Sequence, residues 1–223
     1  MSLFFRQAFL IFKKDITTEF REARHFFSIL LFGILLLLIF SFALSADPEL
    51  MRKMAAGLFW LATLFSSILA LNHSFEKETE EGQWEGLLLL GSDPKALYLG
   101  KLLANVTFLF LMQIILLPLM AILFDLTLAF SLFGVLLLGS VGIATLGTFY
   151  SGLTVSLREG QVLLPLLLFP MLVPVLLATV KITELILVHD LFEQQVAWFK
   201  LLIIFDGIFL LASLLCAEIL FDS

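Results

Sequence analysis

Residues 26–44 read FFSILLFGILLLLIFSFAL, an apolar run without a charged residue. A helix needs about 20 such residues to cross the roughly 30 Å of hydrocarbon in a bilayer. Similar runs follow at residues 54–71, 102–124, 126–154, 162–180 and 201–220. The chain is 61% hydrophobic and 14% charged, whereas a soluble domain is about half apolar and about a quarter charged. The sequence therefore predicts an all-α membrane protein whose residues 26–223 form a domain of six transmembrane helices.

Residues 1–25 precede the first span and have the pattern of an amphipathic helix. Apolar side chains recur at spacings of three and four: Phe5, Phe9, Phe12, Ile16 and Phe20. Basic residues occupy other positions: Arg6, Lys13, Lys14, Arg21 and Arg24. Such a helix lies in the headgroup layer, with its aromatic face toward the acyl chains and its basic face toward anionic lipid. The alternative is a soluble helix packed on other protein.

The basic residues also predict the orientation of the chain. With the N-terminus in the cytoplasm, nine lysines and arginines fall on the inner side: five in residues 1–25, three in residues 72–101, and Arg158. Four fall on the outer side: Arg52, Lys53, Lys181 and Lys200. Cytoplasmic loops of membrane proteins carry the excess of lysine and arginine. We therefore expect both termini in the cytoplasm. A signal peptide is not expected, because the first apolar run is too long and lacks a small-x-small site.

The longest polar interruption is residues 72–101, NHSFEKETEEGQWEGLLLLGSDPKALYLGK. Its acidic part is predicted to form a short helix, residues 76–85, lying across the inner membrane surface. We interpret it as a coupling segment that binds a soluble partner, with Trp84 as the apolar anchor. Its candidate contact residues are Glu76, Glu78, Glu80, Glu81, Gly82, Trp84, Glu85 and Gly86. The alternative is a solvated loop.

The fourth and fifth spans carry two further patterns. Small side chains recur every four residues in the fourth span, at Ser140, Ala144, Thr148 and Gly152. Such a face allows close helix contact, and we favour packing within the chain over a dimer interface. The fifth span contains Pro170 and Pro174, each of which removes a backbone hydrogen bond and tends to kink a helix. The kink suits a moving gate, although proline is also common in membrane helices generally.

Asp206 lies inside the sixth predicted span, and an ionisable residue there is a functional-site hypothesis by default. We prefer a position at the outer interface, beside Trp198. Residues 182–199 have helical periodicity and predict a short outer or re-entrant helix before the sixth span. His189 falls in this outer stretch and is a candidate ligand contact; isolated histidines at span edges are otherwise interfacial polar residues.

Several function classes have no support in the residues. The net charge of -6 argues against a nucleic-acid partner. Cys216 is the one cysteine, so no CxxC or CxxCH motif exists. There is no HExxH, no GxSxG and no defensible serine–histidine–acid set, so neither a metal site nor an enzyme is expected. No Walker A sequence is present, and Gly100-Lys101 is interpreted as a span boundary.

The residues also resemble one family. Residues 71–105 and 164–181 (LPLLLFPMLVPVLLATVK) look like the CcmB family, as do FKKDITTEFR at 12–21 and SILLFGILLLLIFSFAL at 28–44. The similarity covers essentially the whole chain. It departs at Ser92-Asp93-Pro94-Lys95, where the family pattern has serine-proline and arginine. This difference concerns how the segment contacts its partner and does not affect membership of the family.

The resemblance implies the architecture of an ABC-2-type exporter permease in the bacterial inner membrane, acting in cytochrome c maturation. It implies a separate ATPase subunit of the Ccm A type, a second copy of this chain, haem-handling membrane subunits of the Ccm C and D types, and a periplasmic haem chaperone of the Ccm E type. Haem would be cargo and ATP would act through the partner, so no cofactor is assigned to the chain itself. The alternatives are a permease for lipid, drug or polysaccharide, and a membrane assembly scaffold that transports nothing.

Overall fold

A computed structural model describes residues 3–21, 23–80, 93–155, 160–188 and 192–221 of the chain. These residues form seven helices and no strand: α1 (Leu3–Arg21), α2 (Ala23–Leu44), α3 (Pro48–Glu80), α5 (Pro94–Phe124), α6 (Leu132–Val155), α7 (Gly160–Leu187) and α8 (Phe192–Phe221). All except α1 are long and apolar enough to cross a bilayer. The predicted all-α membrane fold with six spans is confirmed, and the chain is a multi-pass membrane protein.

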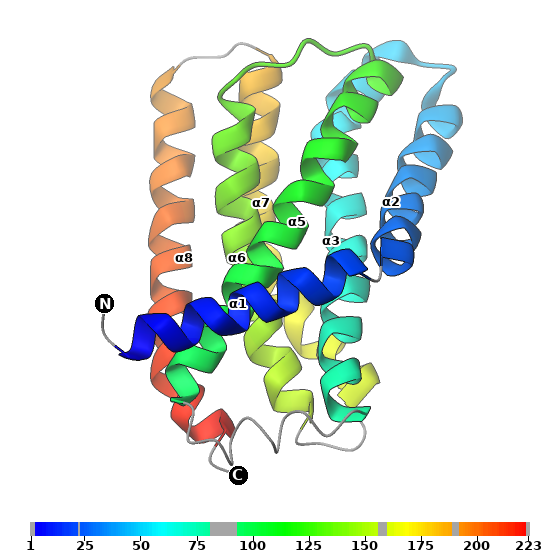
Figure 1. Ribbon diagram of the computed structural model, residues 1–223. Coiled ribbons are helices and arrows are strands. Elements are labelled where there is room, and N and C mark those ends of the chain that lie inside the picture. Colours follow the sequence, from blue (N-terminus) through cyan, green and yellow to red (C-terminus); the bar gives the residue numbers. More distant parts are fainter. Residues whose placement is uncertain (1–2, 22, 81–92, 156–159, 189–191, 222–223) are drawn as a thin grey trace.

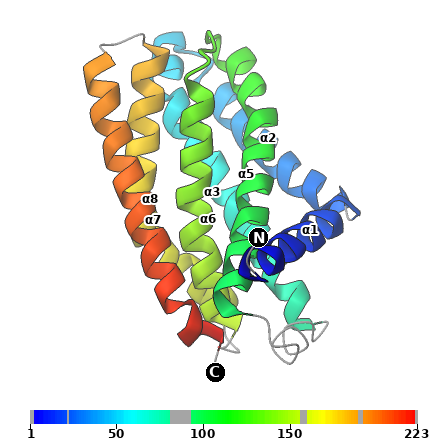
Figure 2. The same ribbon diagram turned by 60° about the vertical axis from the view of Figure 1, so that its left-hand side comes forward.

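The six long helices form one bundle, and α1 lies across it (Figure 1). Turning the view by 60° shows the same crossing from the side, with α1 against α5 (Figure 2). The C-terminal ends of α3, α6 and α8 and the N-terminal ends of α5 and α7 gather at the end of the bundle nearer α1 (Figure 1). We call this the α1 end; α2 and α3 are joined at the opposite end.

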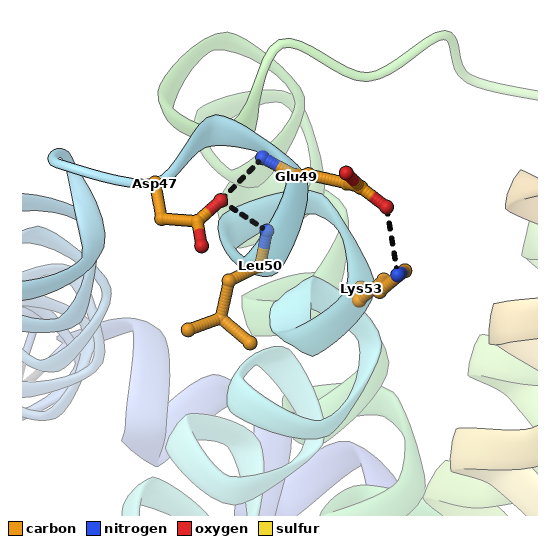
Figure 3. Close-up of polar contacts among 4 residues, drawn as sticks. All are labelled: Asp47, Glu49, Leu50 and Lys53. Atoms are coloured by element: carbon orange, nitrogen blue, oxygen red, sulfur yellow. Dashed lines mark hydrogen bonds and ion pairs between the residues drawn. The ribbon is translucent and has the colours of Figure 1, made fainter.

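Two of the long helices begin with the same dipeptide, Asp-Pro. At the start of α3, Asp47 Oδ1 accepts hydrogen bonds from the backbone N–H groups of Glu49 (3.1 Å) and Leu50 (3.0 Å), and Lys53 pairs with Glu49 at 2.8 Å (Figure 3). At the start of α5, Asp93 accepts from the Lys95 N–H at 2.9 Å. An aspartate before a helix satisfies first-turn N–H groups, and proline suits the first helical position.

The end of α5 corrects the predicted start of the next span. Asp125 terminates α5 in a left-handed conformation (φ 51°), and its N–H donates to the Ala121 carbonyl. We expected the fourth span to begin at residue 126. That is wrong, because residues 126–131 are not helical and α6 begins at Leu132. The connection is therefore longer than the tight turn that the sequence suggested.

Two predicted short helices are not separate elements. α3 continues without a break from the apolar run through Asn72 to Glu80, so residues 76–80 extend the second span; residues 81–85 lie outside the described part. The outer helix predicted at residues 182–199 is also wrong. Its first residues extend α7 to Leu187, and its last residues are the start of α8 at Phe192.

The centre of the bundle is α6, which packs against α3, α5, α7 and α8. Glycines on α6 allow this close approach. A Cβ atom on Gly139 would lie 2.2 Å from the Trp60 ring of α3, and one on Gly147 would lie 2.2 Å from Leu71 of α3. α3 and α6 are the most buried spans, and α2 and α8 the most exposed. Their outward faces carry large apolar side chains such as Phe42 and Leu215, which suits contact with lipid.

Candidate functional site

The first feature of the α1 end is the close contact between α1 and α5. Gly100 of α5 lies directly under α1, since a Cβ atom there would lie 2.7 Å from the Ala8 carbonyl oxygen and 2.7 Å from Ile11 Cβ. Ala8 and Ile11 are both buried. The packing face of α1 is thus made of small and aliphatic residues, rather than of the phenylalanines that defined its periodicity.

An ion pair joins the same two helices. Lys101 Nζ lies 3.7 Å from Asp15 Oδ2 of α1, and the Lys101 side chain is only 1% exposed. We expected Gly100-Lys101 to mark the boundary of a span. The structure corrects this, because Lys101 lies within α5 and is buried under α1. A lysine beside a glycine, early in an apolar helix, was the sequence signal that could have found it.

A small cavity lies next to this ion pair, between α1, α3 and α5. Its volume is about 30 Å³, and it is lined by Asp15, Ile16, Glu19, Ala70, Ala104, Asn105 and Phe108. About 10–15 Å³ of such volume is enough to hold one water molecule. The cavity therefore has room for water beside polar groups.

The remaining faces of α1 stay available to the surroundings. Phe5 and Phe9 are 57% and 56% exposed, and Arg6 and Lys13 are also exposed. Phe12 and Ile16 are half-buried, and the side chain of Phe20 is outside the described part. The aromatic and basic residues thus occupy faces of α1 that the bundle does not cover. This distribution suits the predicted position in the headgroup layer.

The predicted coupling segment is placed only in part. Glu76, Glu78 and Glu80 belong to the last turns of α3, at the α1 end of the bundle. Their side chains are outside the described part of the structure, as are Glu81, Gly82, Trp84, Glu85 and Gly86. The backbone therefore shows that residues 76–80 continue a membrane-crossing helix.

The small-residue face of α6 lies against α5 of the same chain. Asn105 Nδ2 donates to Thr148 Oγ1 at 2.8 Å, and Ser140 Oγ donates to Gln113 Oε1 at 3.2 Å. Ala144 and Gly152, the other members of this predicted face, are buried as well. Asn105 and Gln113 were not singled out from the sequence, although uncharged polar residues inside an apolar span are a recognisable signal.

A tyrosine adds a polar contact among three helices. The Tyr98 hydroxyl of α5 donates to the Thr145 carbonyl of α6 at 3.0 Å, near Ser213 of α8. Tyr98 is fully buried. Buried tyrosines usually bond their hydroxyl in this way, because an unpaired polar group inside a protein is costly.

The fifth span, α7, contains both prolines of the predicted gate. Pro170 is exposed and Pro174 is half-buried, and α7 continues through both of them to Leu187. Further along, Thr183 of α7 accepts a hydrogen bond of 2.9 Å from Trp60 Nε1 of α3 and donates to the Thr179 carbonyl. The part of α7 that follows both prolines is therefore fixed to α3.

Asp206 does not lie at the outer interface, and that expectation is wrong. It occurs midway along α8, its exposure is 5%, and neither carboxyl oxygen has a hydrogen-bond partner. Its carboxyl group faces α6, because a Cβ atom on Gly142 would lie 2.5 Å from Asp206 Oδ1. Asp206 is buried because Gly142 has no side chain and leaves room for the carboxyl group. The sequence alone does not show that these two residues are neighbours.

Other predicted residues form no site in the described part. His189 and Arg158 lie outside it, and His25 is half-buried near the start of α2. Within the described residues, no three histidine, cysteine, aspartate or glutamate side chains come together as metal ligands. The described arrangement at the α1 end is thus one of helix contacts and charged side chains.

Comparison with known proteins identifies the family. The family model described as "CcmB protein" matches residues 6–222. "Heme exporter protein B" of Haemophilus influenzae is 31% identical over 176 residues, covering 78% of this chain and 80% of the relative. The proteins of that name from Pseudomonas aeruginosa and Rhodobacter capsulatus are each 30% identical, covering 75% of this chain and 76% and 78% of their own. With a match over nearly its whole length, this six-span chain belongs to the CcmB family.

Proposed function

We propose that this chain is the membrane permease subunit of an ABC-type haem exporter, and that it acts in loading or releasing haem on a chaperone during c-type cytochrome biogenesis. The observation that carries the proposal is the family match over residues 6–222, together with relatives named heme exporter protein B. The chain is a non-catalytic transport subunit in this proposal. ATP hydrolysis takes place on a separate ATPase of the Ccm A type.

The chain lies in the bacterial inner membrane with both termini in the cytoplasm. The support is the distribution of charge over the two ends of the bundle. The exposed basic residues of α1, among them Arg6, Lys13 and Arg21, lie at the α1 end. The opposite end carries Arg52 and Lys53 beside acidic residues, with Arg52 paired to Asp125 and Lys53 to Glu49. By the positive-inside rule the α1 end is then cytoplasmic.

The ATPase binds at the α1 end, on the coupling segment 72–101. The acidic residues from Glu76 to Glu80 continue α3, so a displacement of these residues is transmitted along one helix into the bundle. At the other end of the segment, Gly100 and Lys101 contact α1. A nucleotide-driven movement would thus pass into α3 directly and into α1 and α5 together. The two prolines of α7 offer the bundle a place to bend.

The other partners follow from the family rather than from any contact in the chain. They are a second copy of this chain, membrane subunits of the Ccm C and D types, and a periplasmic haem chaperone of the Ccm E type. The buried positions of the described spans include a single basic residue, Lys101, which is engaged by Asp15. A path for a large anionic porphyrin would need basic side chains along it, so we infer that the role of the chain is to transmit movement.

Deletion and rescue test the function. A strain from which the gene is deleted should lose c-type cytochromes and accumulate a chaperone without haem, and the full-length chain should restore both. Affinity purification of the restored chain should also recover an ATPase. A deletion strain with normal c-type cytochromes and an altered lipid, drug or polysaccharide export would support the alternative permease. Normal assembly with no dependence on ATP turnover would support the scaffold.

A charge-reversal variant tests the coupling segment. The combined change Glu80→Lys, Trp84→Ala and Glu85→Lys should abolish recovery of the ATPase, because it removes the acidic face and the apolar anchor. The matched control is Glu49→Lys with Glu184→Lys, which reverses exposed carboxylates at the opposite end. The control should still recover the ATPase. Equal recovery with both variants would contradict the docking role and favour the alternative, in which the segment 72–101 binds no partner.

A further inference from the structure

The inference concerns Asp206, the acidic residue that the proposed function does not use. Asp206 occurs midway along α8, between Phe192 and Phe221. The side chain faces the interior of the bundle, and its exposure is 5%. Both oxygens, Oδ1 and Oδ2, are buried, and neither has a hydrogen-bond partner in the described structure. Buried carboxylates in membrane proteins ordinarily have a cation or donors beside them, so this one requires an explanation.

The carboxyl group lies beside Gly142 of α6, with Val175 of α7 next to the same position. A Cβ atom built on Gly142 of α6 would lie 2.5 Å from Asp206 Oδ1 and 2.7 Å from Val175 Cγ1 of α7. The carboxyl group therefore occupies a niche that exists because residue 142 is glycine and that Val175 closes from the side of α7. No donor from either helix reaches the oxygens.

The charged residues of the helices that pack against α8 are engaged or exposed elsewhere. α6 has no charged residue. On α7, Lys181 and Glu184 are exposed and pair with each other at 2.8 Å. On α5, Lys101 pairs with Asp15 of α1, and Lys95 lies in the first turn, at the α1 end. On α8 itself Lys200 is exposed, and the side chains of Glu193 and Glu218 are outside the described part.

Tyr98 is the ionisable residue of α5 that faces the same α6–α8 contact. Its hydroxyl donates to the Thr145 carbonyl and lies near Ser213, which is two turns of α8 away from Asp206. No described group is thus placed to stabilise a negative charge on Asp206. A carboxylate ion in an apolar niche is strongly disfavoured, whereas a neutral acid is compatible with it and can donate its O–H to a helix carbonyl.

We propose that Asp206 is a proton-binding site at mid-depth in the bundle, which holds its proton while α6, α7 and α8 are packed as described and releases it when they separate. The step is a simple ionisation. The carboxylic acid gives its proton to water that enters when the niche opens, and the carboxylate takes a proton back before the helices can close again. Closing over the charged form is blocked, because the charge would lose its water without gaining a partner.

The consequence is that helix separation in this part of the bundle is linked to proton uptake and release. Alkaline conditions favour the separated arrangement, and acidic conditions favour the closed one. The inference holds for any cargo, so it does not depend on haem being transported. Its test therefore reads protonation directly and can succeed or fail independently of the proposed function.

The experiment is infrared spectroscopy of the full-length chain in lipid nanodiscs, titrated from acidic to alkaline pH. The carbonyl stretch of a protonated carboxylic acid distinguishes the acid from its ion. Exposed aspartates and glutamates ionise near pH 4, so we expect a band that survives at neutral pH. Asp206→Asn should remove this band. Asp125→Asn, which neutralises an exposed carboxylate, should leave it unchanged.

Gly142→Ala gives a second readout, because the added methyl group would lie 2.5 Å from Asp206 Oδ1 and would displace the carboxyl group from its niche. The frequency of the surviving band should then change. If Asp206→Asn fails to fold, Asp206→Glu makes the assignment instead, since it keeps the acid and shifts the carbonyl stretch. The proposal is overturned if the wild-type protein has no protonated-acid band at neutral pH, or if such a band persists unchanged in these Asp206 variants.

Discussion

The most informative perturbation of the bundle is a single methyl group added to α6 at Gly139. In the substitution Gly139→Ala, the new Cβ atom would lie 2.2 Å and 2.6 Å from two atoms of the Trp60 ring, and 3.0 Å from Thr179 Cγ2. Trp60 cannot move aside easily, because it is fully buried and its Nε1 donates to Thr183 at 2.9 Å. The variant must therefore push α3 or α7 away from α6.

The magnitude follows from two opposing terms. Glycine to alanine in a helix gains about 0.8–1 kcal/mol of helix propensity. Overpacking a tight core costs about 1–3 kcal/mol, and a contact of 2.2 Å with a fully buried ring belongs at the upper end of that range. We expect Gly139→Ala to lower the free energy of unfolding by about 2 kcal/mol. Gly57→Ala is the matched control, because nothing lies within 4 Å of its Cβ position, and it should be neutral or slightly stabilising.

The assay is unfolding in mixed micelles titrated with sodium dodecyl sulfate, followed by helix content and tryptophan fluorescence. Trp60→Phe provides the compensating change, because it removes the ring atoms that collide with the new methyl group. The double variant Gly139→Ala, Trp60→Phe should lose less stability than the sum of the two single variants, by about 1–2 kcal/mol, which is within the range for residues in contact. If Gly139→Ala is as stable as Gly57→Ala, the contact between α3 and α6 is not as tight as described.

Three smaller predictions use the same assay. Thr148→Val should lower the free energy of unfolding by about 0.6–1.7 kcal/mol, the range for hydrogen bonds between membrane helices, because Asn105 loses its acceptor. An unchanged free energy of unfolding would show that this bond does not form. Asp125→Val should be about 1–2 kcal/mol less stable than Asp125→Gly, because only the valine is strained at φ 51°. Both lose the ion pair to Arg52, so equal stability would contradict the left-handed conformation. Asp47→Ala should cost about 0.5–2 kcal/mol and speed hydrogen exchange in the first turn of α3, whereas Asp47→Ser should not; equal exchange in the two variants would rule out the cap.

The sequence predicted which segments cross the membrane, and it failed at their ends. An apolar run reports where lipid covers a helix, but the backbone hydrogen bonds that continue a helix need no apolar side chains. The residues after Leu71 therefore extend α3 to Glu80, since glutamate and lysine are good helix formers. The reverse occurs at residues 126–131, which are apolar and yet not helical after the left-handed Asp125.

The residues of the candidate site were predicted unevenly, for a related reason. Periodicity identified α1, but its packing face depends on Gly100, which lies on another helix. Lys101 stands beside a span boundary in the sequence and is buried only because α1 folds over it. Asp206 was recognised as unusual, and its burial depends on Gly142 of α6. In each case the missing information was the partner surface, which a single sequence does not contain.

Helices are inserted into the membrane in the order of synthesis, so the niche at Gly142 is available before α8, which carries Asp206, is inserted. α5 is already in the membrane when α6 arrives, so Gln113 and Asn105 can bond Ser140 and Thr148 at once. α8 comes last and carries an acid at mid-depth, which costs about 2.5–3.5 kcal/mol on insertion scales for an isolated helix. A preformed α6–α7 surface removes Asp206 from lipid. The integration of the last helix of this chain therefore depends on the helices that precede it.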